Sequence, residues 1–255
     1  MKYLITLLFL TISLFANKME YIKLYEQNKI KDALIEANKY AKDSNRSEPL
    51  YFIGKIYYYG DGVKKDEKKG ILFFKKAAEK HNKDAIFQLN AIKLTDSKSS
   101  KKIQELSFKK LLMLARQGYA PAEVIVGMSY FYGKGVKKDY KQSFFWLRRA
   151  AIQGNDDANY LVGWMYATGT GVKEDKDLAI EHLKLPAQHG DVKALEFISR
   201  LMIERDKQRF HGNKFSAETV MWTKMALRNG VDLWKEWNDL ELQLYEDEEL
   251  EKKLK

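Results

Sequence analysis

The sequence has no cysteine, only 3 prolines and only 4 histidines among its 255 residues. Without cysteine the chain forms no disulfide bond and offers no thiolate as nucleophile or metal ligand, so packing alone must stabilise it. The histidines are scattered at no spacing typical of a metal site, and we expect neither a metal nor a cofactor. Few prolines, together with 15 glycines, 15 tyrosines and 13 phenylalanines, indicate helices that are separated by glycine turns.

The N-terminal residues carry an apolar run that is too short to span a bilayer. It extends from Leu4 to Phe15, follows Met1-Lys2-Tyr3 and closes on Ala16, whereas a spanning helix needs roughly 20 residues. This pattern predicts a secretory signal peptide over residues 1–16 that is cleaved after Ala16. We therefore expect a periplasmic or secreted protein, with a membrane tether only if the segment stays uncleaved.

The charge is unbalanced but not concentrated. Lysine and arginine number 45 against 35 acidic residues, a net charge of +10. The lysines are spread along the chain and interleaved with carboxylates, which is typical of a solvated helical surface and not of a stripe that follows phosphates. We expect no nucleic-acid partner.

An internal repeat dominates the sequence. Residues 54–66, 127–139 and 163–175 align without gaps, and their first glycines lie 73 and 36 residues apart, so a divergent copy lies between the first two. The alanines that open successive copies keep a spacing of 36 or 37 residues: Ala85, Ala122, Ala158 and Ala194. A period of this length indicates stacked helix pairs.

Each position of the motif has a physical role, which the first copy illustrates. Gly54 lies inside an apolar helix and predicts close approach of a second helix. Gly60 ends the first helix in the left-handed conformation, and Asp66 caps the start of the second. The second helices end at glycines 118, 154, 190 and 230, and we expect His81 to serve there in the first copy.

These features predict an all-α fold, an α/α solenoid or superhelix of helix-turn-helix repeats with helical caps. Residues 17–48 form an N-terminal helical hairpin, and residues 231–255 form the C-terminal capping helices. Between them lie five repeats, of which the second and the fifth are degenerate, at 49–84, 85–121, 122–157, 158–193 and 194–230.

The motif resembles the Sel1-like repeat family, α/α solenoids related to tetratricopeptide repeats. The family pattern is A-x-x-x-L-G-x-x-Y-x-x-G-x-G-V-x-x-D followed by A-x-x-W-x-x-A-A-x-x-G, and the resemblance covers Pro49 to Gly230. Trp146 and Trp222 occupy its tryptophan position. His182 stands there in the fourth repeat, where we interpret it as a packing residue.

Catalytic motifs are missing: the sequence has no H-E-x-x-H, no G-x-S-x-G and no P-loop. Some exported, cysteine-rich members of the resembling family carry a β-lactamase or penicillin-binding attribution. Two S-x-x-K matches, Ser99/Lys102 and Ser107/Lys110, have no S-D-N or K-T-G beside them. A hydrolase of that kind is the alternative to a non-catalytic protein.

Binding is the favoured function, because the first helices of stacked pairs line a concave face that suits a peptide or protein segment. Aromatic and methionine side chains that the repeat does not require would serve as apolar anchors there, although packing between repeats could also explain each of them. The candidates are Lys55, Tyr58, Tyr59, Met128, Phe131, Tyr132, Trp164 and Thr168. We expect a monomeric adaptor with a protein or peptide partner in the cell envelope.

Overall fold

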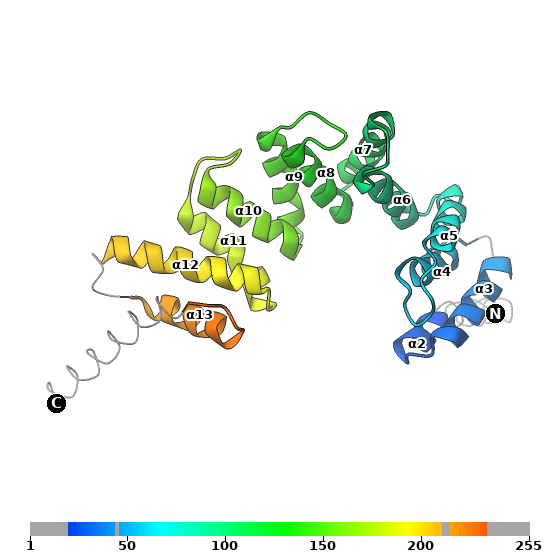
Figure 1. Ribbon diagram of the computed structural model, residues 1–255, viewed down its shortest axis with the longest axis horizontal. Coiled ribbons are helices and arrows are strands. Elements are labelled where there is room, and N and C mark those ends of the chain that lie inside the picture. Colours follow the sequence, from blue (N-terminus) through cyan, green and yellow to red (C-terminus); the bar gives the residue numbers. More distant parts are fainter. Residues whose placement is uncertain (1–19, 44–45, 211–214, 234–255) are drawn as a thin grey trace, which may run out of the picture. The chain divides into compact units, whose positions relative to one another are not determined.

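The computed structural model describes residues 20–43, 46–210 and 215–233 (Figure 1). Within these ranges the chain forms twelve α-helices and no strand, as the repeat predicted. It divides into two compact units, residues 1–110 and 111–255, and the boundary lies inside α7 (Lys101–Arg116). The predicted signal peptide and residues 234–255 of the predicted C-terminal cap lie outside the described residues.

The first unit begins with two short helices that pack on the first repeat. Their apolar side chains form one core with α4, which includes Tyr21, Leu34 and Ile53. A second apolar cluster joins the start of α4 to the end of α5 through Leu50 and Ala77. The helices are α2 (Glu20–Glu26), α3 (Ile30–Asp43), α4 (Glu48–Tyr59), α5 (Glu67–Glu79) and α6 (Lys83–Thr95).

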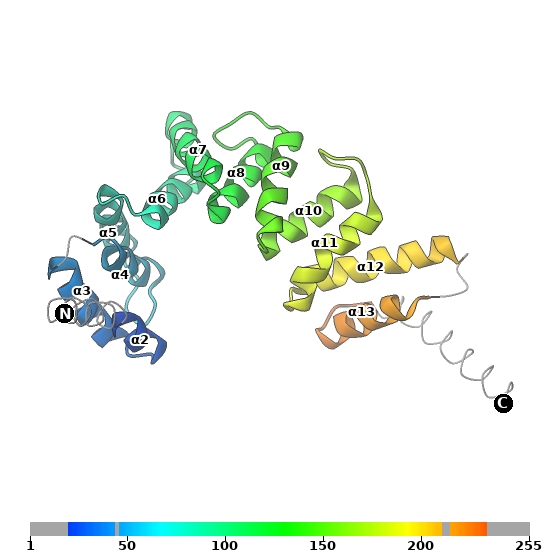
Figure 2. The same ribbon diagram turned by 180° about the vertical axis from the view of Figure 1, so that it is seen from behind.

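The second unit contains three successive helix pairs, which Figures 1 and 2 show from opposite sides. Each helix from α8 onward packs on the next one. Val162 and Met165 lie in the core between the first two pairs, and Leu195 and Met202 lie in the core of the last two. The helices are α8 (Ala120–Tyr132), α9 (Tyr140–Ile152), α10 (Asp156–Thr168), α11 (Lys176–Gln188), α12 (Val192–Arg209) and α13 (Ala217–Arg228).

The glycines have the roles that the motif predicted. A Cβ on Gly127 would lie 2.6 Å from Cγ of Leu147, so only glycine lets α8 and α9 approach this closely. Gly133 ends α8 with φ +74°, a left-handed conformation that other residues adopt at a cost. His81 takes φ +60° at the end of the first repeat, as we expected for that position.

Both helices of the fourth repeat begin at a residue whose side chain caps them. Asp175 accepts the backbone N–H of Leu178 at 2.9 Å, the predicted cap of α11. Asn155 accepts the N–H of Ala158 at 2.8 Å and caps α10, a role that the sequence analysis did not assign. Asn82 and Asp191 cap α6 and α12 in the same way. The signal was available, because a polar residue stands three positions before each of these opening alanines.

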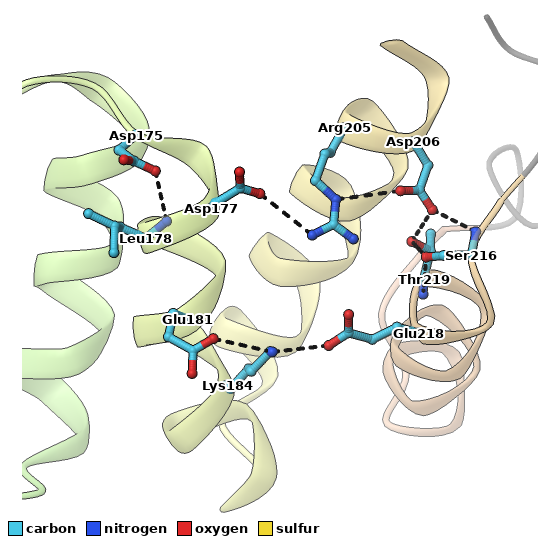
Figure 3. A network of polar contacts seen from close by, with 10 residues as sticks. All are labelled: Asp175, Asp177, Leu178, Glu181, Lys184, Arg205, Asp206, Ser216, Glu218 and Thr219. Atoms are coloured by element: carbon cyan, nitrogen blue, oxygen red, sulfur yellow. Dashed lines mark hydrogen bonds and ion pairs between the residues drawn. The ribbon is translucent and has the colours of Figure 1, made fainter. Parts of the chain in front are cut away.

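The fifth repeat departs from the motif at its turn. Arg205 and Lys207 stand where the fourth repeat has Gly169 and Gly171, so nothing ends the helix, and α12 continues for 18 residues. Asp206 is buried and accepts hydrogen bonds from the N–H of Ser216 at 2.7 Å and from the hydroxyl of Thr219 at 2.5 Å (Figure 3). One carboxylate thereby joins the two ends of the rewritten turn.

Burial alone would raise the pKa of the Asp206 carboxyl. The hydrogen bonds from Thr219 and Ser216, together with the Arg205 guanidinium, outweigh that effect and hold the pKa below its ordinary value. Figure 3 also shows Arg205 facing Asp177 of α11, at 3.7 Å, and Lys184 between Glu181 and Glu218. These contacts tie α11 and α12 to the start of α13.

Candidate functional site

An aromatic patch (Phe131, Tyr132, Tyr140 and Trp164) forms in the second unit where α8, α9 and α10 meet. The ring of Phe131 lies at its centre, with centroids 5.0 Å from Tyr132, 5.2 Å from Tyr140 and 5.6 Å from Trp164. Tyr132 is 64% exposed and Tyr140 is 39% exposed. Phe131 and Trp164 are half-buried against the core and so hold the exposed rings in place. Three helices therefore present two tyrosines on a fixed aromatic base.

The other candidates of this unit border the patch on α8 and α10. Met128 is half-buried and packs against the same core as Phe131 and Trp164. Thr168 is exposed, but its hydroxyl donates to the carbonyl of Trp164 at 2.9 Å. Thr168 thus contributes to the end of α10, and Met128 contributes to the core of the third and fourth repeats.

Tyr140 is not among the candidates predicted from the sequence, because it begins a second helix and the predicted concave face consists of first helices. It follows the capping Asp139 directly, and this position fixes its ring beside the end of α8. Lys138 adds a cation at 5.6 Å from the centroid of the Tyr140 ring. An aromatic residue directly after a helix cap is the signal that could have indicated it.

The remaining candidates lie on α4 in the first unit. Lys55 is exposed, with its ammonium 5.9 Å from the centroid of the Tyr51 ring. Tyr58 is half-buried against Phe74, and this burial raises the pKa of its hydroxyl. Tyr59 is 57% exposed, and its hydroxyl accepts a hydrogen bond from Gln88 at 2.9 Å. The predicted set is thus divided between the two units, with five members in the second.

An ion pair with a buried carboxylate joins α8 to α9 within the third repeat. The Glu123 side chain is completely buried, and its Oε1 lies 2.9 Å from Nη2 of Arg149. Its Oε2 accepts a hydrogen bond from Nε2 of Gln153 at 2.8 Å. Burial raises the pKa of Glu123, although Arg149 and Gln153 act in the opposite direction. The pair carries no exposed reactive group, so we interpret it as structural.

His182 is a packing residue, as its position in the fourth repeat suggested. Its ring stacks on Tyr166 with centroids 5.7 Å apart, and Nδ1 lies 3.0 Å from Oδ1 of Asn159. Burial, with a smaller contribution from Arg148, lowers the pKa of the imidazole below its ordinary value. This shift disfavours the charged imidazolium, and His182 takes the repeat position that tryptophan has in repeats three and five.

Three further observations concern other site chemistries in the described part of the chain. Within it, no cluster of three or more histidine and carboxylate side chains is placed to hold a metal ion. No helix among those residues has the length and apolarity that a bilayer span requires. Of the two S-x-x-K matches, Ser107 is 3% exposed on α7, whereas Lys110 faces solvent.

Comparison with known proteins identifies the repeat. The model of the Sel1 repeat matches residues 50–82, 120–155 and 156–191, which contain α4 and α5, α8 and α9, and α10 and α11. The crystal structure of a Sel1 repeat protein from Oxalobacter formigenes is 32% identical, with a TM-score of 0.67 over 83% of this chain and 84% of that one.

Two further structures share the fold at lower identity. A protective antigen present in uropathogenic Escherichia coli strains is 20% identical, with a TM-score of 0.65 over 84% of this chain and 46% of that one. An immunity protein from Pseudomonas aeruginosa is 17% identical, with a TM-score of 0.51 over 78% of this chain and 74% of that one. No curated protein matches the sequence.

Proposed function

Because this chain belongs to the Sel1 repeat family, we propose that it is a non-catalytic interaction scaffold of the cell envelope that binds a peptide or protein segment. The aromatic patch is the observation that supports this proposal. Interfaces are dominated by a few side chains, among which tyrosine, tryptophan and arginine are enriched. Tyr132 and Tyr140 combine high exposure with a fixed base, so they lose little side-chain entropy when a partner covers them.

The location in the cell envelope is the second part of the proposal, and the apolar run from Leu4 to Phe15 supports it. We expect the mature protein to begin at Asn17 and to be recovered outside the cytoplasm. Fractionation followed by mass spectrometry of the intact protein tests this directly. A full-length chain that retains Met1 and sediments with the membrane would contradict cleavage and would indicate that the segment tethers the protein to the membrane.

Substitution of both exposed tyrosines, Tyr132→Ala/Tyr140→Ala, is expected to remove the partner. Each hot-spot side chain contributes about 2 kcal/mol, so the affinity should fall about thirtyfold if one tyrosine is a hot spot and about a thousandfold if both are. The matched control is Ile152→Ala, because Ile152 is 72% exposed at the end of α9 but does not belong to the patch. The measurement is capture of partners from cross-linked envelope by the three proteins, with helicity checked by circular dichroism.

A partner that wild type and Ile152→Ala retain and that the double variant loses supports the aromatic patch as the site. Equal capture by a folded double variant would move the site away from the patch. If no protein captures any partner, the scaffold function itself fails.

A further inference from the structure

We propose that the segment bound at the aromatic patch is acidic, a carboxylate-bearing stretch of a protein whose apolar side chain packs on Tyr132 and Tyr140. This inference rests on the proposed function and specifies the chemistry of its partner. Its basis is the turn that follows Tyr132. Residues 134–141 contain four lysines and a single carboxylate. That carboxylate, Asp139, already accepts the backbone N–H of Gln142 at 3.0 Å as the cap of α9.

Three of the lysines in residues 134–141 have no carboxylate partner in the described part of the chain. Lys137, Lys138 and Lys141 are exposed, and none of them forms an ion pair with a carboxylate among the described residues. The ammonium of Lys138 lies directly beside the Tyr140 ring. Cationic charge that no described carboxylate pairs with therefore lies in the turn beside an exposed aromatic surface, and this combination attracts an anion that also carries an apolar group.

The other two glycine turns show that this charge is not required by the repeat. Residues 170–177 of the fourth repeat contain two lysines and three carboxylates, and residues 61–68 of the first contain three of each. In the fourth repeat, Lys176 pairs with Glu204 at 2.7 Å. In the first, Lys65 pairs with Glu67 at 2.7 Å. The excess of cations thus belongs to the one turn that borders the aromatic patch.

The distribution of charge along α10 favours a short acidic segment over an extended polyanion. This helix has Trp164 and Thr168 in its last turns and begins with Asp156 and Asp157. The two ends are about 18 Å apart at 1.5 Å per residue. A nucleic acid or an anionic bilayer that covered the whole helix would meet these carboxylates, whereas a peptide of a few residues at the patch would not.

Fluorescence anisotropy with defined probes tests the inference. The probe is a labelled synthetic peptide of alternating glutamate and phenylalanine, compared with its glutamine isostere, a single-stranded oligonucleotide and vesicles that contain an anionic phospholipid. The proteins are wild type, the patch variant Lys137→Gln/Lys138→Gln/Lys141→Gln, and the control Lys75→Gln/Lys83→Gln/Lys93→Gln. The control removes the same charge from exposed lysines of the first unit.

We expect the acidic peptide to bind wild type and the control equally, to lose at least tenfold in affinity for the patch variant, and to weaken with added salt. Equal losses in both variants would overturn the inference, because they would show attraction to net charge alone. Equal binding of the glutamine isostere, no binding of the acidic peptide, or stronger lysine-dependent binding of the oligonucleotide or vesicles would also overturn it. If Tyr132→Ala/Tyr140→Ala loses the captured partner but the patch variant keeps it, only this inference fails and the proposed function stands.

Discussion

Gly171→Ala is expected to destabilise the second unit by about 3 kcal/mol, because it combines an unfavourable backbone conformation with a steric clash. Gly171 has φ +75°, which costs roughly 1–2 kcal/mol for an alanine. Its added Cβ would also collide with the backbone carbonyl of Tyr140. Because a backbone carbonyl cannot rotate away as a side-chain end can, overpacking adds roughly 1–3 kcal/mol.

Gly154→Ala is the matched control for this experiment. Gly154 has φ +82°, but no heavy atom lies within 4 Å of the position that its Cβ would take. Its substitution should therefore cost only the conformational part, about 1 kcal/mol. Urea unfolding followed by circular dichroism gives both values. Equal losses of stability in the two variants would contradict close packing of the turn of the fourth repeat against the start of α9.

Arg149→Met is expected to cost about 3 kcal/mol at neutral pH, because it leaves the buried Glu123 carboxylate without its cation. Part of the loss comes from packing, since the guanidinium lies 5.1 Å from the Trp146 ring centroid. The double variant Glu123→Leu/Arg149→Met removes both charges and should recover most of the stability. Unfolding of the two single variants and the double variant gives the coupling energy. A double variant as unstable as Arg149→Met would assign the loss to packing alone.

The pH dependence of Arg149→Met separates charge from packing. The pKa of Glu123 is already above its ordinary value of 4.5 because of burial, and Arg149 opposes that rise. A raised pKa in the folded state means that the carboxyl favours folding most below 4.5 and disfavours it increasingly as the pH rises. Without Arg149 the pKa rises further, so the difference in stability between wild type and variant should widen between pH 4.5 and 7. A constant difference would mean that water solvates Glu123 in the variant.

The features that the sequence predicted best are those that depend on a few neighbouring residues. Gly133 takes a left-handed conformation and Asp139 caps a helix for reasons contained in about six residues. The turns of the degenerate repeats were harder to predict, because the residues that replace their glycines bind residues far away along the chain. Asp206 replaces the glycine turn of the fifth repeat by binding Ser216, ten positions away.

The candidate site was predicted only in part for the same reason. Phe131 and Trp164 were selected because they lie on first helices, but their contact with Tyr140 depends on how α9 is placed against α8. The role of Glu123 required knowledge of its partners, since a glutamate in an apolar helix gives no sign of being buried. The repeat pattern therefore predicts where a residue lies in its own helix, but not which side chains of neighbouring helices meet.

The caps of the fourth repeat have a consequence for how such chains grow. Residues 155–190 contain a start signal for each of their two helices, Asn155 and Asp175, and a glycine after each, Gly169 and Gly190. A tandem duplication of this segment would insert a complete helix pair that begins and ends without help from its neighbours. Gene duplication can therefore lengthen this array by whole repeats without inventing a new boundary.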